Sequence, residues 1–442
     1  MEILIKATQL ILSLSILVIF HEFGHFIASK IFGARVEKFY LFFDPWFSLF
    51  KFKKGDTEYG VGWLPLGGYV KISGMIDESM DKEAMKLPPQ PWEFRSKPAW
   101  QRLIIMLGGV TVNILLAIGI YILMLFTWGE QYLPTAGVKY GIVVDSLGAE
   151  MGLRNGDKIL SVDGEKVEDF RKIPGKIILD DAKTIQVERG GELTDVKIPE
   201  GFISKMLKQK TADFIRMRIP FVVDGFSKDS PAKDAGVLKG DRIIGINGQP
   251  TLYFDEFKEV VGKSKGQTVD LTLLRSSDTL HMPVAVTADG MIGVMPNSDM
   301  SAFFNLNEKK FTLLEAIPVG TVKAYTSIGD YLKSLKLLFS PKVKAYESVG
   351  GFISIGNIFP SVWHWESFWG LTAFLSVMLA ILNVLPIPAL DGGHVMFLFY
   401  EIITRRKPSD KFLEYAQIVG MVLLLALLVF ANGNDIVKLF RH

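Results

Sequence analysis

Four long runs of apolar residues interrupt an otherwise mixed pattern of hydrophobic and polar positions. They cover Ala7–Ser29, Leu103–Trp128, Ser367–Leu390 and Tyr415–Asn434. A helix crosses a bilayer with roughly 20 mainly apolar residues, and each run reaches that length. The only formal charge within the four runs is that of Glu22. We therefore predict a polytopic α-helical membrane protein with four transmembrane helices.

The first apolar run occupies the position at which a secretory signal peptide would stand. It continues into His21 and Glu22, and no small-residue cleavage site follows its apolar part. We therefore expect this helix to be retained and to serve as the first transmembrane helix.

Short alternating segments with Gly-Asp turns occur twice between the second and third apolar runs. The Gly156-Asp157 pair recurs at 240–241, and Asp163-Gly164 recurs as Asn247-Gly248, an offset of 84 residues. Asp-Gly and Asn-Gly are typical hairpin turns, so each copy predicts a small strand-rich domain. The landmarks resemble PDZ domains of the bacterial protease type, which implies binding of peptide ends or extended segments as an added strand. The alternative, that the copies are spacers or size filters, stays open.

These patterns divide the chain into two halves of a membrane core with two inserted β-rich (α+β) domains. A further segment, Lys309–Lys344, has apolar residues at helical spacing among scattered lysines, which is typical of an amphipathic helix at a membrane surface and also of an ordinary packed helix. The expected parts are 1–130 for the first half of the core, 131–215 and 216–303 for the PDZ domains, 304–345 for the amphipathic segment and 346–442 for the second half of the core.

Composition supports a membrane protein and restricts the chemistry. Hydrophobic residues make up 49% of the 442 residues, and the mean hydropathy is +0.28. The 49 Lys and Arg nearly balance the 47 Asp and Glu, so nucleic acid is not an expected partner. The chain contains no cysteine, so any metal must be bound by His, Asp or Glu.

The distribution of basic residues predicts an orientation in the membrane. The segment from Lys30 to Arg102 contains 12 Lys and Arg, and the loop before the fourth apolar run contains Arg405, Arg406, Lys407 and Lys411. Short loops rich in Lys and Arg face the cytoplasm, so the insert with the two repeats is expected on the outer side. Membrane lipids are therefore expected to surround the core.

The end of the first apolar run carries the pattern His-Glu-x-x-His. Residues four apart share one face of a helix, so His21 and His25 can bind a single zinc ion while Glu22 lies beside the attacking water. Zinc lowers the pKa of its bound water to about 7, and the glutamate takes the proton. Ionisable residues inside a membrane helix are costly and usually functional. The alternative is a polar patch that joins helices by hydrogen bonds.

A catalytic zinc with two His ligands needs a third protein ligand, and the segment Asn383–His394 offers one. Pro386 and Pro388 break the third helix, and glycines 392 and 393 permit a turn that brings Asp391 inward. We assign Asp391 as the third ligand, with His394 as the competing choice. The alternative for Asp391 is a helix cap at the membrane edge.

The two motifs, 366 residues apart, resemble those of the site-2 proteases, of the bacterial regulator-of-sigma-E type with tandem PDZ domains. The resemblance runs nearly end to end. It implies an intramembrane zinc metalloprotease of the bacterial inner membrane, with its active site towards the cytoplasm and its PDZ domains in the periplasm. It also implies anti-sigma factors and remnant signal peptides as substrates, and Zn²⁺ as the cofactor. The positions that match the two motifs are His21, Glu22, His25, Asn383, Pro386, Pro388, Leu390, Asp391 and Gly392.

Three further segments resemble the family more weakly. Gly62–Lys71 contains Gly67, Gly68 and Tyr69 and is similar to a family loop that presents substrate as an added strand. Gly109–Asn113 matches a G-P-x-x-N motif except that Val110 replaces the proline, and the segment Gly350-Gly351-Phe352 has phenylalanine where many relatives have proline.

Two amides within the apolar runs have two possible roles. Asn113 and Asn383 either bind the substrate backbone or stabilise its developing negative charge, or they only join helices by hydrogen bonds.

Two other function classes compete with the protease. A membrane metal transporter would use the intramembrane His and Asp residues as a path, but these groups cluster at one depth and the other runs carry no charge. A catalytically inactive scaffold would use only the PDZ pair, but Glu22 and all three expected ligands are present. Both comparisons favour the protease.

Overall fold

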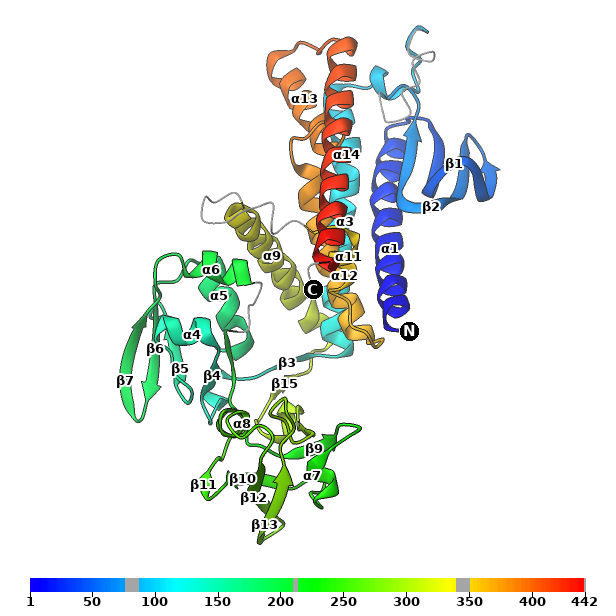
Figure 1. Ribbon diagram of the computed structural model, residues 1–442. Helices are drawn as coiled ribbons and strands as arrows, with labels where there is room; N and C mark the ends of the chain where they lie inside the picture. The colour runs from blue at the N-terminus through cyan, green and yellow to red at the C-terminus, as the bar shows by residue number, and fades with distance from the viewer. Residues whose placement is uncertain (76–86, 210–213, 339–349, 441–442) are drawn as a thin grey trace. The chain divides into compact units, whose positions relative to one another are not determined.

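The computed structural model describes residues 1–75, 87–209, 214–338 and 350–440. These residues form two compact units, each with its own interior. The first unit contains the described residues of 1–129 and 310–440, and the second contains those of 130–309. Figure 1 shows that the first unit is mainly helical and the second is rich in strands.

Four helices of the first unit are long and apolar enough to cross a membrane, as predicted. They run roughly parallel to one another in Figure 1. The first and fourth extend beyond both predicted ends, and the second begins four residues early and ends at Thr127, whereas the third stops at Val384 and not at Leu390. It stops because Pro386 and Pro388 lack the N–H groups that would continue the helical hydrogen bonds. The four are α1 (Glu2–Ile31), α3 (Ala99–Thr127), α12 (Trp365–Val384) and α14 (Asp410–Phe440).

Small residues set the spacing between α1 and α3. A Cβ atom at Gly24 would lie 2.2 Å from the backbone oxygen of Gly108, and one at Gly108 would lie 2.5 Å from the oxygen of Gly24. Glycine on both helices therefore lets their backbones touch, as is common for helix pairs in membranes. This contact brings the His-Glu-x-x-His segment of α1 against α3.

A long antiparallel hairpin covers the other side of α1. Strand β1 (Val36–Lys54) pairs with β2 (Thr57–Ile72), with Val36 opposite Ile72 at the open end. Its register shifts repeatedly, and Phe42 and Trp46 have φ of 67° and 75°. The β-like loop predicted at Gly62–Lys71 is thus one part of a longer two-stranded sheet, and both strands pack on α1.

Helix α9 (Leu313–Leu338) occupies most of the segment for which we predicted an amphipathic helix. It packs on α3, with Ala316 and Ala324 fully buried, and a Cβ atom at Gly320 would lie 2.7 Å from the Ile122 side chain. The segment therefore forms a helix that packs one of its faces on α3. Residues 339–344 of the predicted segment lie outside the described residues. In the part of this unit that the structure describes, the other helices are η1 (Phe94–Ser96), α11 (Phe352–Gly356) and α13 (Asp391–Thr404).

The second unit contains two copies of a small strand-rich arrangement. In each copy the predicted hairpin turn is confirmed, because Asp163-Gly164 and Asn247-Gly248 all have positive φ, as a type I′ turn requires. The sheets are β5-β6-β7 and β4-β8 in the first copy, and β11-β10-β12-β13 and β14-β9 in the second.

The first copy is built from β4 (Ile142–Val144), α4 (Ser146–Met151), β5 (Lys158–Val162), η3 (Phe170–Lys172), α5 (Ile173–Leu179), β6 (Thr184–Arg189), β7 (Glu192–Lys197), α6 (Phe202–Gln209) and β8 (Ile215–Met217). The second is built from β9 (Val223–Phe226), α7 (Pro231–Asp234), β10 (Arg242–Ile246), β11 (Gln249–Pro250), α8 (Phe254–Gly262), β12 (Thr268–Arg275), β13 (Asp278–Ala285) and β14 (Val294–Pro296). The flanking elements of this unit are β3 (Glu130–Tyr132), η2 (Thr135–Gly137), η4 (Met300–Ala302) and β15 (Asn307–Lys309).

The interior of the second copy is a cluster of buried apolar side chains. Phe221 and Phe257 pack at a centroid distance of 4.8 Å, and Val269, Leu271 and Leu273 from alternate positions of β12 complete the core.

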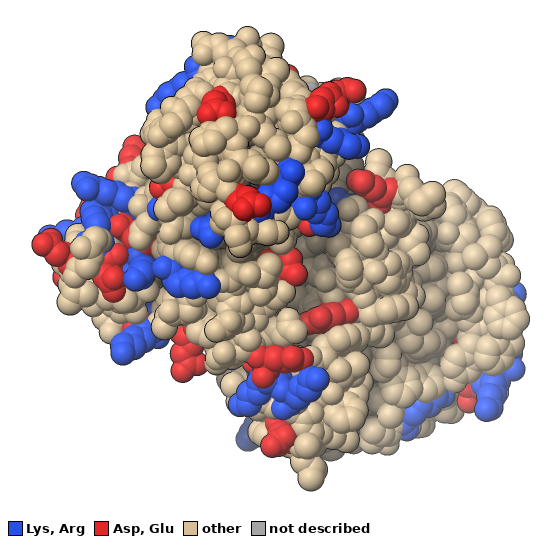
Figure 2. All heavy atoms as spheres, turned by 90° about the horizontal axis from the view of Figure 1, so that it is seen from below, with Lys and Arg blue, Asp and Glu red and all other residues tan. Residues whose placement is uncertain are grey.

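On the face drawn in Figure 2, Lys and Arg lie interspersed with Asp and Glu. That mixture agrees with the near balance of charge along the sequence.

Candidate metal centre

Helix α1 presents two imidazoles on one face. His21 and His25 lie one helical turn apart, and their side chains are about nine-tenths buried or more. Their ring centroids are 4.9 Å apart and the rings stand edge to face, at 79°. The spacing of four residues therefore aims both rings at the same region beside α1.

A broken helix delivers the carboxylate. Ala389 has φ of 73°, and the chain turns there so that α13 begins with Asp391. Glycine is required after it, because a Cβ atom at Gly392 would lie 2.1 Å from the Leu385 oxygen and one at Gly393 would lie 2.7 Å from the Ile387 oxygen. A carboxylate in the first turn of a helix also lies favourably in the field of the helix dipole.

Two neighbours hold this turn in position. Helix α14 approaches closely, since a Cβ atom at Gly420 would lie 2.0 Å from the Pro388 oxygen, and Gln417 accepts a 3.2 Å hydrogen bond from the Ala389 amide. Helix α13 is joined to α3 by an ion pair of 2.5 Å between Arg102 and Glu401. The helix that carries Asp391 is thus fixed at both of its ends.

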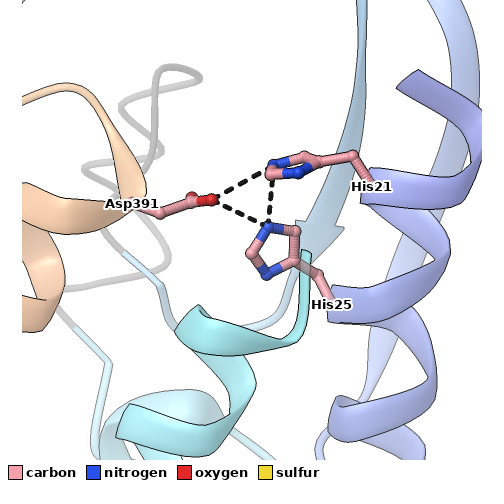
Figure 3. A group of neighbouring side chains, drawn as sticks. All are labelled: His21, His25 and Asp391. Carbon is pink, nitrogen blue, oxygen red and sulfur yellow. Dashed lines mark hydrogen bonds and ion pairs between the residues drawn. The ribbon is translucent and has the colours of Figure 1, made fainter. Parts of the chain in front are cut away.

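The structure brings His21, His25 and Asp391 together (Figure 3). The His21 Nε2 and His25 Nε2 atoms are 3.3 Å apart, and Asp391 Oδ2 lies 3.1 Å from the first and 3.2 Å from the second. Ligands bound at 2.0–2.1 Å in a tetrahedral zinc site lie about 3.3 Å from one another. The three donor atoms therefore have the types and the separations that zinc requires.

Glu22 lines the same cavity as the three potential ligands. The cavity has a volume of about 670 Å³. Glu22 also lies beside β2, because a Cβ atom at Gly68 would be 3.6 Å from the Glu22 Cγ atom. A carboxylate at this position is suited to accept a proton from a water held between the ligands and the sheet.

Strand β2 forms one wall of this cavity, through Gly68, Tyr69, Val70, Lys71 and Ile72. The Tyr69 hydroxyl donates a 2.9 Å hydrogen bond to Asp44, a cavity residue that sequence reasoning missed. Burial raises the pKa of Tyr69, and this hydrogen bond raises it further, so the phenol stays neutral. Of the three residues predicted in this segment, Gly68 and Tyr69 line the cavity, whereas Gly67 lies against the Phe43 ring.

Both predicted amides lie at His21. The Asn113 side-chain nitrogen is 3.2 Å from His21 Nδ1, and that of Asn383 is 3.3 Å from His21 Nε2. His394, the competing third ligand, lines the cavity but does not belong to the group of three donors within reach of one ion. Gly109 and the Ile105 carbonyl also touch the imidazoles. The motif Gly109–Asn113 signalled Gly109 in the sequence, and no motif signalled Ile105.

Comparison with known proteins agrees with this geometry. Residues 9–427 match the peptidase family M50. The regulator of sigma-E protease RseP of Escherichia coli is 28% identical, and the alignment covers 97% of this chain and 98% of that protein. The regulator of sigma E protease of Haemophilus influenzae is 26% identical over 99% of this chain and all of its own length. A protein of Neisseria meningitidis named "Putative zinc metalloprotease" is 28% identical, with coverage of 97% and 98%. The chain therefore belongs to peptidase family M50 and is a metalloprotease of that family.

Proposed function

We propose that the chain is an intramembrane zinc metalloprotease that hydrolyses peptide bonds within transmembrane segments of single-pass membrane proteins. The observation that carries this proposal is the meeting of His21, His25 and Asp391 beside Glu22, in one cavity between apolar helices and a two-stranded sheet. The zinc in the names of relatives supports the same ion here.

The residues take distinct roles in this proposal. His21, His25 and Asp391 hold the zinc ion, which when bound lowers the pKa of a water molecule and polarises the peptide carbonyl. Glu22 takes a proton from the attacking water and returns it to the leaving amine. Asn383 is the group best placed to donate a hydrogen bond to the negative charge that develops on the peptide oxygen.

Substrate binding is assigned to the edge of β2. A peptide bond in a transmembrane helix is shielded, so the segment must unwind before water can attack it. Among the described residues strand β2 pairs with β1 alone, and its residues 68–72 line the cavity. An unwound segment that pairs with this edge would satisfy its backbone groups and lie next to Glu22.

The two repeats and the orientation complete the proposal. We assign 131–215 and 216–303 as PDZ domains that either bind peptide or exclude bulky outer domains. The basic loops support an orientation with the metal centre towards the cytoplasm and the repeats in the periplasm of a cell with an inner membrane. The names of the relatives RseP and regulator of sigma E protease support a role in the control of a sigma factor, and the substrates in this proposal are anti-sigma factors, with remnant signal peptides as a second class.

Cleavage by purified protein tests this function. The full chain in detergent is incubated with a tagged single-span substrate, as wild type, as Glu22→Gln and with a zinc chelator followed by zinc. Loss of a general base typically costs roughly 10²–10⁴-fold in rate. We expect Glu22→Gln to lose cleavage to that extent while it keeps bound zinc, and the chelator to abolish cleavage until zinc is restored.

Two results would contradict the proposal. One is product formation by Glu22→Gln at the wild-type rate. The other is cleavage that persists after zinc has been removed to below stoichiometric amounts, as measured by elemental analysis.

A further inference from the structure

One face of α3 lies directly against both imidazoles. Ile105, Gly109 and Asn113 are four residues apart, so they form a single row along this helix. Ile105 and Asn113 are completely buried. Each member of the row contacts a different part of the two imidazoles.

The first contact determines where His25 carries its proton. His25 Nδ1 lies 2.9 Å from the Ile105 backbone oxygen. A carbonyl oxygen can only accept a hydrogen bond, so Nδ1 must be the protonated nitrogen. In the neutral ring, the form that can bind a metal ion, the lone pair of His25 is therefore on Nε2, which is the atom that faces His21 and Asp391.

The second contact gives the rings their space. A Cβ atom at Gly109 would lie 2.5 Å from His25 Nε2 and 2.6 Å from His21 Cε1. Both distances are shorter than any side chain tolerates, so only glycine lets the two rings lie against α3. Absence of a side chain at 109 also leaves the Ile105 carbonyl, one turn earlier, open to His25.

The third contact concerns the amide of Asn113. Its nitrogen lies 3.2 Å from His21 Nδ1, while its buried Oδ1 has no hydrogen-bond partner among the described residues. An amide nitrogen only donates, so this orientation would need the proton of His21 on Nε2, where a cation must bind. A half-turn of the amide exchanges its two ends. Oδ1 then accepts from Nδ1–H, and His21 Nε2 keeps its lone pair.

We propose that Ile105, Gly109 and Asn113 form a second layer of the metal centre that selects the same tautomer in both imidazoles. Asn113 is in this sense a positioning residue, and it acts on the ion through His21. The inference rests on the proposed zinc centre. Hydrogen-bond partners of this kind typically change metal affinity by about 10–100-fold.

Zinc affinity of the full chain tests the role of Asn113. Affinity is measured in detergent by competition with a chelating zinc indicator, for wild type, Asn113→Leu and Asn113→Asp. Leucine has a similar size but no acceptor, and we expect it to weaken zinc binding about 10–100-fold. Aspartate keeps an acceptor for Nδ1–H, and we expect it to recover most of that loss.

A matched control distinguishes the positioning of His21 by Asn113 from the general effect of removing a buried amide. Gln9 lies on α1, is completely buried and donates a 2.8 Å hydrogen bond to the Pro360 oxygen, far along the helix from His21. We expect Gln9→Leu to lower the unfolding temperature of the zinc-free protein as Asn113→Leu does, and to leave zinc affinity at the wild-type value.

Three results would overturn the inference. They are wild-type zinc affinity in Asn113→Leu, an Asn113→Asp protein that binds zinc as weakly as Asn113→Leu, and an equal loss of zinc affinity in Gln9→Leu. In each case wild-type protein that binds zinc and cleaves substrate would leave the proposed function intact. A wild-type protein that binds no zinc would instead contradict the proposed function itself.

Discussion

Asp157 and Asp241 occupy the same place in the two repeats, and both are almost completely buried. Each accepts one hydrogen bond of 2.8 Å from an arginine Nε and one of 2.7 Å from its Nη2, donated by Arg189 in the first copy and Arg275 in the second. Each also accepts a 2.8 Å hydrogen bond from a backbone amide. Every carboxylate oxygen therefore faces a donor that belongs to the chain.

The carboxylate of Asp391, in the first unit, has different neighbours. Asp391 Oδ2 lies near two imidazole nitrogens, and in a neutral His25 the nearest nitrogen carries a lone pair, because the one proton of the ring is directed to Ile105. Acceptor atoms with lone pairs repel one another unless a cation lies between them.

The difference separates a structural carboxylate from a candidate metal ligand. In the repeats the positive charge is a fixed arginine, so the pair is complete and stabilises a turn. In the first unit two imidazole nitrogens and a carboxylate oxygen converge within reach of one another, and no arginine or lysine pairs with this carboxylate among the residues that the structure describes, so the arrangement suits a bound cation. Burial alone does not distinguish the two regions, whereas the identity of the facing atoms does.

The largest expected effect comes from the carboxylate of the metal centre. We expect Asp391→Asn to weaken zinc binding by more than the roughly 10–100-fold that follows loss of a second-layer partner, because a direct ligand is removed. Cleavage should be lost in parallel. Zinc content and cleavage are measured on the same purified sample.

His394 provides the control for this substitution, since it lines the same cavity about one turn after Asp391. We expect His394→Asn to retain zinc. The reverse pattern, zinc lost from the His394 variant and kept by the Asp391 variant, would show that the third ligand was assigned wrongly.

The buried carboxylate of the second repeat should behave in the opposite way. Hydrogen bonds to charged groups contribute about 1.5–3 kcal/mol, so Asp241→Asn is expected to destabilise its repeat by that amount. Zinc affinity should not change. Thermal unfolding and chelator competition on the full chain measure the two quantities, and Asp157→Asn should give the same result in the first repeat. A change in zinc affinity would mean that the repeats and the metal centre are coupled.

A smaller effect is expected from the support behind Asp391. In Gly420→Ala the new Cβ atom would lie only 2.0 Å from the Pro388 oxygen. Overpacking typically costs 1–3 kcal/mol, so we expect about a tenfold loss of zinc affinity as the turn before Asp391 moves. Gly433→Ala on the same helix has no neighbouring atom within 4 Å and should bind zinc as wild type does. Equal behaviour of the two variants would argue against support of the turn by α14.

The smallest expected effect is a dependence of the second repeat on pH. Burial tends to raise the pKa of Asp241, but the hydrogen bonds from Arg275 and the Leu238 amide outweigh it and hold the pKa below its usual 3.8. A depressed pKa in the folded state adds stability that is fully present above about pH 4 and is lost as the pH falls through the folded value. The difference in unfolding temperature between wild type and Asp241→Asn should therefore narrow below about pH 4. A constant difference down to pH 2 would contradict this explanation.

Local patterns in the sequence were sufficient for several elements. The four apolar runs predicted the four long helices because helix length and side-chain polarity decide whether a segment can cross a bilayer. The turns at Asp163-Gly164 and Asn247-Gly248 were predictable because positive φ at both positions is a local requirement. The position of His21 and His25 on one face of the same helix followed from helical spacing alone.

Other features depended on contacts between distant segments. The sequence motif at Gly109–Asn113 had no visible connection to the histidines, and the extent of the β1–β2 hairpin exceeded the segment predicted for it. The choice between Asp391 and His394 also stayed open in the sequence. Each of these depends on how helices and strands pack against one another, which a periodic pattern within one segment does not contain.

The sequence by itself determined the chemistry available to this protein: two imidazoles and a glutamate on one helix, a carboxylate after a broken helix, and no cysteine. Only the tertiary structure decided that Asp391 meets His21 and His25, and that α3 lies behind both rings with a glycine and an amide. The physical reason is that donor types are properties of single residues. Their separations of 3.1–3.3 Å are set by the packing of three helices whose contacts span hundreds of residues.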